Sequence, residues 1–198
     1  MAAVGGVAAV KKAVELSDNL TQAQGRMKML TGSDAAASQM NDAIYSLANR
    51  SRAGYLDTAN FVTNMGTNAG VGAKGAFANA EELLRFSESV NKLFVISNTP
   101  AEGQKAATLQ LTQAMSSGVL RGEELNSVFG QAPQIIQTVA DYLDVPLGKI
   151  RSMAAEGQIS ADVVKKAMLA SANEIDKKFS KMPYTWAQIW TVASNVIL

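Results

Sequence analysis

The sequence predicts an all-α protein, a multi-helix bundle of helical hairpins with short helices in the second half and long helices at both ends. Three observations predict this fold. The chain is rich in alanine and methionine, which suit closely packed helices, and aromatic residues make up only 6% of it. Apolar residues recur at spacings of three and four, which is the period of one helix face. Helix start and stop signals punctuate the chain, whereas the one short apolar run, 93–96, continues a helical pattern.

The first helix is predicted from about residue 13 to Gly32, and one seam of apolar and small residues runs along it. The seam consists of Ala13, Leu16, Leu20, Ala23, Met27 and Leu30. Such spacing is typical of an amphipathic helix in a bundle, and a coiled coil is the alternative. Gly32 should end this helix.

Three further helices are expected before Pro100. Ser33 can cap the first of them, whose inner face is marked by Met40, Ile44, Leu47 and Ser51. Asp57 is a plausible cap for a short helix through Phe61, Val62 and Met65. A glycine-rich stretch, 66–75, is the best candidate for a hinge. A helix from about Asn79 to Ile96 follows it.

The second half carries clearer boundary signals. Thr99 to Glu102 reads as a capping box with Pro100 at the first helical position, and the helix should stop at Gly118. Shorter helices should follow, and they are expected over 122–129, 133–143 and 146–157. Ser160 should cap a helix that reaches Phe179, because Val164, Met168, Ser171, Ile175 and Phe179 repeat along one face. Thr185 to Gln188 is a second capping box, and the last helix should run to Leu198 without a stop signal.

Composition excludes several kinds of chemistry. The chain contains no cysteine and no histidine, which removes thiol nucleophiles, cysteine metal sites, the usual general base and the commonest metal ligand. We therefore expect no catalytic residues, no cofactor and no metal. The formal net charge is +1, and acidic and basic residues are balanced in both halves, so we expect no nucleic-acid binding. No apolar run is long enough to span a membrane.

Two features are candidates for a partner interface. The segment LRGEELNS, 120–127, would display Arg121, Glu123 and Glu124 on a turn, although the same residues equally fit an ordinary helix start. Trp186 and Trp190 lie one turn apart on the last helix, where they either anchor a partner or seal a core.

A third segment, 139–160, resembles the helix-turn-helix motif that reads DNA, which makes a DNA-binding regulator the alternative function. Its predicted second helix offers only Lys149 and Arg151 against Glu156, which is a poor charge pattern for phosphate contacts.

A series of short sequence motifs, in a fixed order, covers most of the chain. Residues 109–190 contain LQLTQAMSSGVLRGEELNSVFGQAPQIIQ, VADYLDVPLGKIRSMAAEGQIS, ADVVKKAM and FSKMPYTWAQIW, and the upstream part contains LSDNLTQAQGRMKMLTG and NDAIYSLANRSRAGYLDTANF. In their order and spacing these motifs resemble the tape-measure domain of tail tape-measure proteins from tailed bacteriophages and prophages.

The resemblance implies a structural protein of the phage tail, involved in tail assembly and tail-length determination. It implies partners among phage tail proteins (tail tube, tail assembly chaperones and tail tip) and a homo-oligomer in the native tail. The implied location is the virion tail, and the host cytoplasm during assembly. Some tape-measure proteins carry cell-wall-cleaving domains, but without histidine, cysteine or a convincing acid pair we do not expect this chain to be an enzyme.

Two segments are expected on this basis. Residues 1–75 would form an N-terminal helical segment with the amphipathic seam and the hinge. Residues 76–198 would form the helical tape-measure core with an open-ended C-terminal helix. Because proline and glycine break the helices often, we expect a folded domain of a longer protein and not a continuous rod.

Overall fold

The computed structural model describes residues 2–196, with side chains described from residue 14 onward, and this part of the chain is all-α. It contains eleven helices and two isolated β-bridges but no strand. The helices are α1 (Ala2–Thr31), α2 (Asp34–Arg50), α3 (Tyr55–Ala69), α4 (Ala80–Ile96), α5 (Ala101–Ser117), α6 (Gly122–Gln131), α7 (Pro133–Tyr142), α8 (Leu147–Ala155), α9 (Ala161–Ala170), α10 (Ala172–Ser180) and α11 (Trp186–Asn195). The predicted fold class is confirmed.

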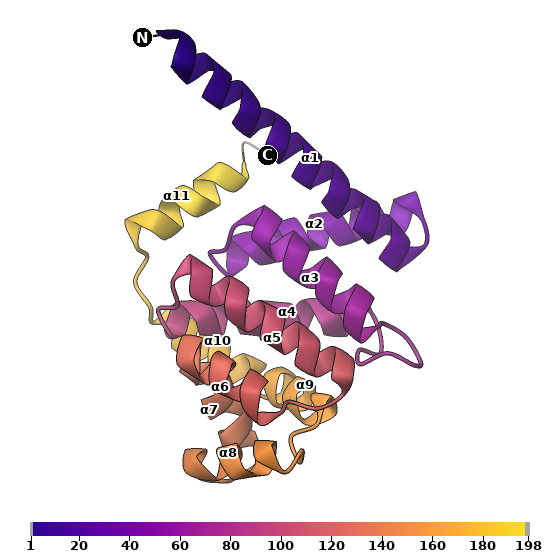
Figure 1. Cartoon of the computed structure of the whole chain (residues 1–198), viewed down its shortest axis with the longest axis vertical. Coiled ribbons are helices and arrows are strands. Elements are labelled where there is room, and N and C mark those ends of the chain that lie inside the picture. Colours follow the sequence, from indigo (N-terminus) through magenta and orange to yellow (C-terminus); the bar gives the residue numbers. More distant parts are fainter. Residues whose placement is uncertain (1, 197–198) are drawn as a thin grey trace.

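The helices stack along the long axis of the molecule (Figure 1). The first part of α1 projects from one end, α2 to α5 form the middle, and α8 lies at the opposite end. The chain then returns, so that α11 lies at the same end as α1 and packs mainly against α2.

Most of the predicted boundary signals act as expected. Gly32, Gly118 and Gly157 follow helix ends with positive φ, and the Ser33 and Ser160 hydroxyls accept backbone N–H groups as N-caps. These signals are local, which is why the sequence reveals them.

Among the predicted boundaries between α2 and α10, three are wrong. Asp57 is not a cap, because α3 begins earlier at Tyr55 with Gly54 as its N-cap. Thr99 forms no capping box: Pro100 is the N-cap of α5, and the Thr99 hydroxyl donates instead to the Gln131 carbonyl at the end of α6. The helix expected from residue 161 to Phe179 is interrupted at Ser171, which lets α9 pack against α7 while α10 packs against α4.

The terminal helices differ from each other in length. The N-terminal helix α1 is long, as expected, but its 30 residues begin at Ala2 and not near residue 13. The C-terminal helix α11 has only 10 residues and is followed by Val196 as its C-cap, so the expectation of a long helix there is not met. Ile197 and Leu198, where the open end was expected, lie outside the described residues.

One hydrophobic core runs from Ala23 of α1 to Ile175 of α10. It passes without interruption across residue 75, since α3 packs against both α4 and α5. The division at residue 75 stays a prediction, and any such division has to cut through this shared core.

Residues 70–75 of the glycine-rich stretch form a closed loop between α3 and α4, whereas residues 66–69 belong to α3. The Gly72 N–H donates to the Phe77 carbonyl and the Phe77 N–H donates to the Gly70 carbonyl, which places Phe77 in the core. Gly70 has φ of 81°, and a Cβ on Gly75 would lie only 2.3 Å from the Gly70 carbonyl carbon. A hinge at this place stays a prediction, and hinge motion would have to break these hydrogen bonds.

Candidate partner interface

Helix α11 presents its apolar side to solvent. Trp186 is 86% exposed and Trp190 is 74% exposed, and Ile189 and Val196 are exposed beside them. The predicted capping box holds the start of the helix, since the Thr185 hydroxyl and the Gln188 side chain each accept the other residue's backbone N–H. Trp186 and Trp190 therefore do not seal the core of this chain, and large exposed apolar surface of this kind marks interaction sites. We call the surface of Trp186, Ile189, Trp190 and Val196 the tryptophan face.

A single polar residue anchors the far end of α11. Asn195 is the only buried residue of the helix. Its side-chain oxygen accepts the Tyr55 N–H at 2.8 Å, and its amide group donates to Asn49 Oδ1 at 2.8 Å and to the Ala53 carbonyl at 3.0 Å. Asn195 thus ties α11 to the turn between α2 and α3.

A buried arginine anchors the segment that leads into α11. Arg52 has φ of 58° and is 7% exposed, and its Nη1 donates to the Met182 and Pro183 carbonyls. Its guanidinium lies 4.4 Å from the ring centre of Phe179 and 3.8 Å from that of Tyr184. Cation–π contacts of this kind are strongest where water is excluded. We refer to Arg52 and Asn195 together as the latch.

A charge network lies beside the latch and joins α2, α4 and α10. Arg50 donates two hydrogen bonds to the Glu88 carboxylate, at 3.1 and 2.7 Å. Lys92 bridges Glu88 at 2.8 Å and Asp176 at 2.6 Å. Burial raises the pKa of Glu88 and is the largest single effect, but the hydrogen bonds and charges of Arg50 and Lys92 together outweigh it. The pKa of Glu88 therefore lies below its ordinary value of 4.5.

This lowered pKa predicts a pH-dependent contribution to stability. Ionised Glu88 stabilises the fold fully above pH 4.5, and this contribution is lost as pH falls through the lower pKa of the folded state. Glu88→Gln should therefore lower the free energy of unfolding at pH 7, and the loss should shrink progressively below pH 4.5. Urea unfolding of both proteins between pH 7 and pH 3 measures this. Glu123→Gln on the exposed start of α6 is the control and should change little, while an equal loss for Glu88→Gln at every pH would contradict the prediction.

The other three candidate residues lie at the start of α6. Arg121 is the exposed N-cap residue, Glu123 is exposed, and Glu124 is partly buried with its Oε2 atom buried and without a hydrogen-bond partner. Both carboxylates lie in the first turn, where they complement the helix dipole. Because α6 packs against α5, α7 and α8 while α11 packs mainly against α2, the fold does not bring the two candidate sets into one surface.

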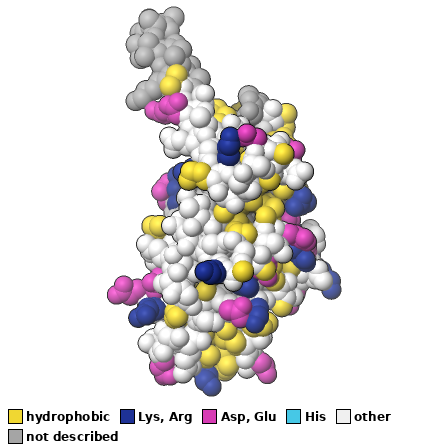
Figure 2. Space-filling view, turned by 90° about the vertical axis from the view of Figure 1, so that its right-hand side faces the viewer, with side chains coloured by type: hydrophobic (Ala, Val, Ile, Leu, Met, Phe, Trp, Pro, Cys, Tyr) yellow, Lys and Arg dark blue, Asp and Glu magenta, His cyan; other side chains and the backbone are white. Residues whose placement is uncertain are grey.

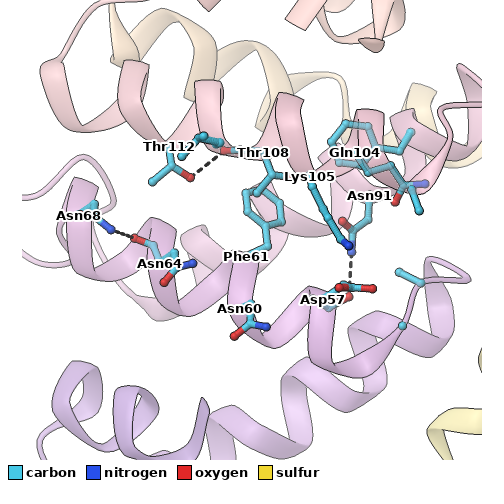
Figure 3. A pocket seen from close by; sticks show the side chains of 16 residues that line it. Asp57, Asn60, Phe61, Asn64, Asn68, Asn91, Gln104, Lys105, Thr108 and Thr112 are labelled. Atoms are coloured by element: carbon cyan, nitrogen blue, oxygen red, sulfur yellow. Dashed lines mark hydrogen bonds between the residues drawn. The ribbon is translucent and has the colours of Figure 1, made fainter. Parts of the chain in front are cut away.

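The structure also reveals a groove that sequence reasoning missed. It has a volume of 540 Å³ and lies between α3 and α5 (Figure 3). Its wall on α3 carries Asn60, Asn64 and Asn68, and its wall on α5 carries Lys105, Thr108 and Thr112. The spacing of four between the asparagines is the signal that places them on one helix face, but only the fold shows which helix stands opposite.

The helix-turn-helix segment corresponds to α7 and α8 joined by a short turn. Lys149 and Arg151 of α8 are exposed, and the Arg151 guanidinium lies 4.6 Å from the Phe129 ring centre, so part of its surface packs against the protein. On the face in Figure 2, Lys and Arg side chains are interspersed with Asp and Glu, and no basic patch forms there.

We expect duplex DNA not to bind specifically at near-physiological salt, because few cations are available to contact phosphates. A mobility-shift assay with titrated salt measures this. Submicromolar binding of a defined sequence that weakens steeply with salt would contradict the prediction and favour a regulator.

Two other kinds of site are absent from the described residues. No group of three or more Asp or Glu side chains there is placed to hold a metal ion. None of the helices in the same residues combines the length and the hydropathy that crossing a bilayer requires.

The fold and the latched helix define the class of this molecule, an all-α multi-helix protein with an outward-facing aromatic helix. A family model described as "Tape measure protein" matches residues 11–198, so the chain belongs to the tape measure protein family. It therefore has a structural role related to phage tails, in a family of structural phage proteins and not of enzymes. Neither a search of curated proteins nor a search of solved structures gave a match.

Proposed function

We propose that this chain is a docking and folding domain of a tail tape measure protein, which takes part in tail assembly and tail-length determination without being the ruler segment itself. One observation carries the proposal: a single core holds the helices from α1 to α10 together. A ruler has to be extended, whereas α2 to α11 have at most 17 residues each and fold back on one another. A 17-residue helix spans only about 25 Å.

The tryptophan face is the proposed contact with the rest of the tail. The proposed partners are the tail tube, the tail assembly chaperones, the tail tip and further copies of this chain. Aromatic side chains suit this role because they dominate the energetics of interfaces. Arg121, Glu123 and Glu124 form a second proposed contact surface, on α6. Docking would take place in the host cytoplasm during assembly, and the domain would then remain in the virion tail.

An in-frame deletion of residues 161–179 in the phage tests the proposal. This segment comprises α9 and most of α10 and supplies Val164, Met168 and Ile175 to the core. If the domain docks, its loss should abolish tail assembly or leave tail length unchanged, as measured by electron microscopy. Infectious particles with tails shortened by about 30 Å, the helical rise of the deleted residues, would show that this segment measures length and would overturn the proposal.

A point variant provides the matched control, because it alters the core without changing the number of residues. Met168 is fully buried, and a carboxylate in its place would be desolvated without a partner. Met168→Asp should therefore have the same effect on tail assembly and tail length as the deletion. Lys166→Asp, on the exposed side of the same helix, should assemble normal tails.

A further inference from the structure

Helix α11 is attached to the body in a way that differs from the other helices of the second half. The preceding helix, α10, buries Ile175 and Phe179. In α11 the buried residue is Asn195, and the partly buried positions are Gln188, Thr191, Val192 and Ser194. The side of α11 toward the body is thus mainly polar, while the tryptophan face points away from it.

The contacts that hold α11 are correspondingly polar. They include the three hydrogen bonds of Asn195 and, in the segment before the helix, the two hydrogen bonds of Arg52 and its contact with the Tyr184 ring, while the Phe179 ring that Arg52 also contacts belongs to α10. A hydrogen bond contributes little net free energy when both partners can bond to water instead. Undocking α11 would return Asn195, the Tyr55 N–H and the Ala53 carbonyl to water, and it would expose little apolar surface.

The connection to the body would allow such a movement. Residues 181–185 between α10 and α11 are not helical, and Pro183 lies among them. The capping box at Thr185 belongs to α11 itself, so the start of the helix keeps its cap when the latch opens.

We propose that α11 is a releasable arm, which undocks from α2 as a helix while α1 to α10 stay folded. It can do so because the polar contacts of the latch, Arg52 and Asn195, hold it against the body, and apolar packing does not. Opening frees the tryptophan face to approach a partner from more than one direction. This inference concerns the chain by itself and does not depend on the proposed role in the tail.

One backbone amide reports on the latch. Tyr55 is the first residue of α3, so its N–H has no acceptor within that helix, and it donates to Asn195 Oδ1 while Tyr55 is only 4% exposed. Val90 in α4 is fully buried and reports on the opening of the body. If α11 is releasable, the Tyr55 amide should exchange with deuterium about 100-fold faster or more, relative to its intrinsic rate, than the Val90 amide in the intact chain, as measured by NMR. Equal protection of the two amides would overturn the inference.

A disulfide between α11 and the body tests whether α11 is the part that moves. A Cβ on Gly54 would lie 3.9 Å from Thr191 Cγ2, and Gly54 has φ of −70°, which other residues adopt. The chain contains no cysteine, so Gly54→Cys with Thr191→Cys introduces the one disulfide. When oxidised, this variant should slow Tyr55 exchange toward the Val90 level, and reduction should restore the fast exchange. Fast Tyr55 exchange that persists in the oxidised protein would place the opening elsewhere and overturn the inference.

Two substitutions complete the test. Arg52→Ala should accelerate Tyr55 exchange by a larger factor than Val90 exchange, because it removes the second part of the latch. Trp186→Ala should leave both rates unchanged, since Trp186 is on the exposed side of α11. If the amides exchange as expected but the chain is dispensable for tail assembly, the inference that α11 is releasable is supported and only the proposed function is wrong.

Discussion

Replacing Trp186 and Trp190 together by alanine is expected to block tail assembly and to leave the domain folded. Both indoles are mostly exposed, so their loss should change the free energy of unfolding by no more than about 0.5 kcal/mol. An interface tryptophan typically contributes about 2 kcal/mol or more to binding, so the pair should lower affinity for the partner by roughly a thousandfold. Tail assembly is measured by electron microscopy after complementation, and stability by thermal unfolding of the purified chain.

Tyr142→Ala is the matched control for this pair. Tyr142 is also an exposed aromatic residue, but it lies on α7, and its loss should affect neither stability nor assembly. The opposite pattern for the tryptophans, strong destabilisation with unchanged association, would show that α11 is part of the core and that the proposed interface is wrong.

Phe77→Ala is expected to cause a large loss of stability. Phe77 is fully buried, and its ring packs edge-on against Phe86 with centroids 5.3 Å apart. Removing such a ring leaves a cavity and typically costs about 3–5 kcal/mol, a large part of the roughly 5–15 kcal/mol that stabilises a domain. The melting temperature should fall by about 10 °C or more, measured by circular dichroism.

The control for Phe77 is Leu109→Ala. Leu109 is more than half exposed beside the groove between α3 and α5, so its truncation should cost less than about 1 kcal/mol. Similar losses for the two variants would mean that the closed glycine loop does not hold Phe77 in the core, and the account of that loop would be wrong.

The sequence by itself determined the helical fold class and most helix boundaries. Helix ends depend on residues within about four positions of each other, such as the Ser33 hydroxyl with the Ala36 N–H, or Gly118 in its left-handed conformation. Buried stripes such as Met40, Ile44 and Leu47 follow from helical periodicity alone. The family resemblance, which the match over residues 11–198 confirms, is likewise a property of the sequence.

Only the tertiary structure decided how these helices meet. Thr99 has the local pattern of a cap, yet its hydroxyl bonds to Gln131 because α6 brings that carbonyl within reach. Nothing in the sequence near Arg52 indicates that its side chain donates hydrogen bonds to the carbonyls of Met182 and Pro183, which lie 130 and 131 residues away. By sequence alone the two tryptophans suit a core and an interface equally well, whereas in the fold Asn195 turns the polar side of α11 toward α2. Local hydrogen bonds and periodicity define each helix, whereas contacts between residues far apart in the chain decide which face of it is buried.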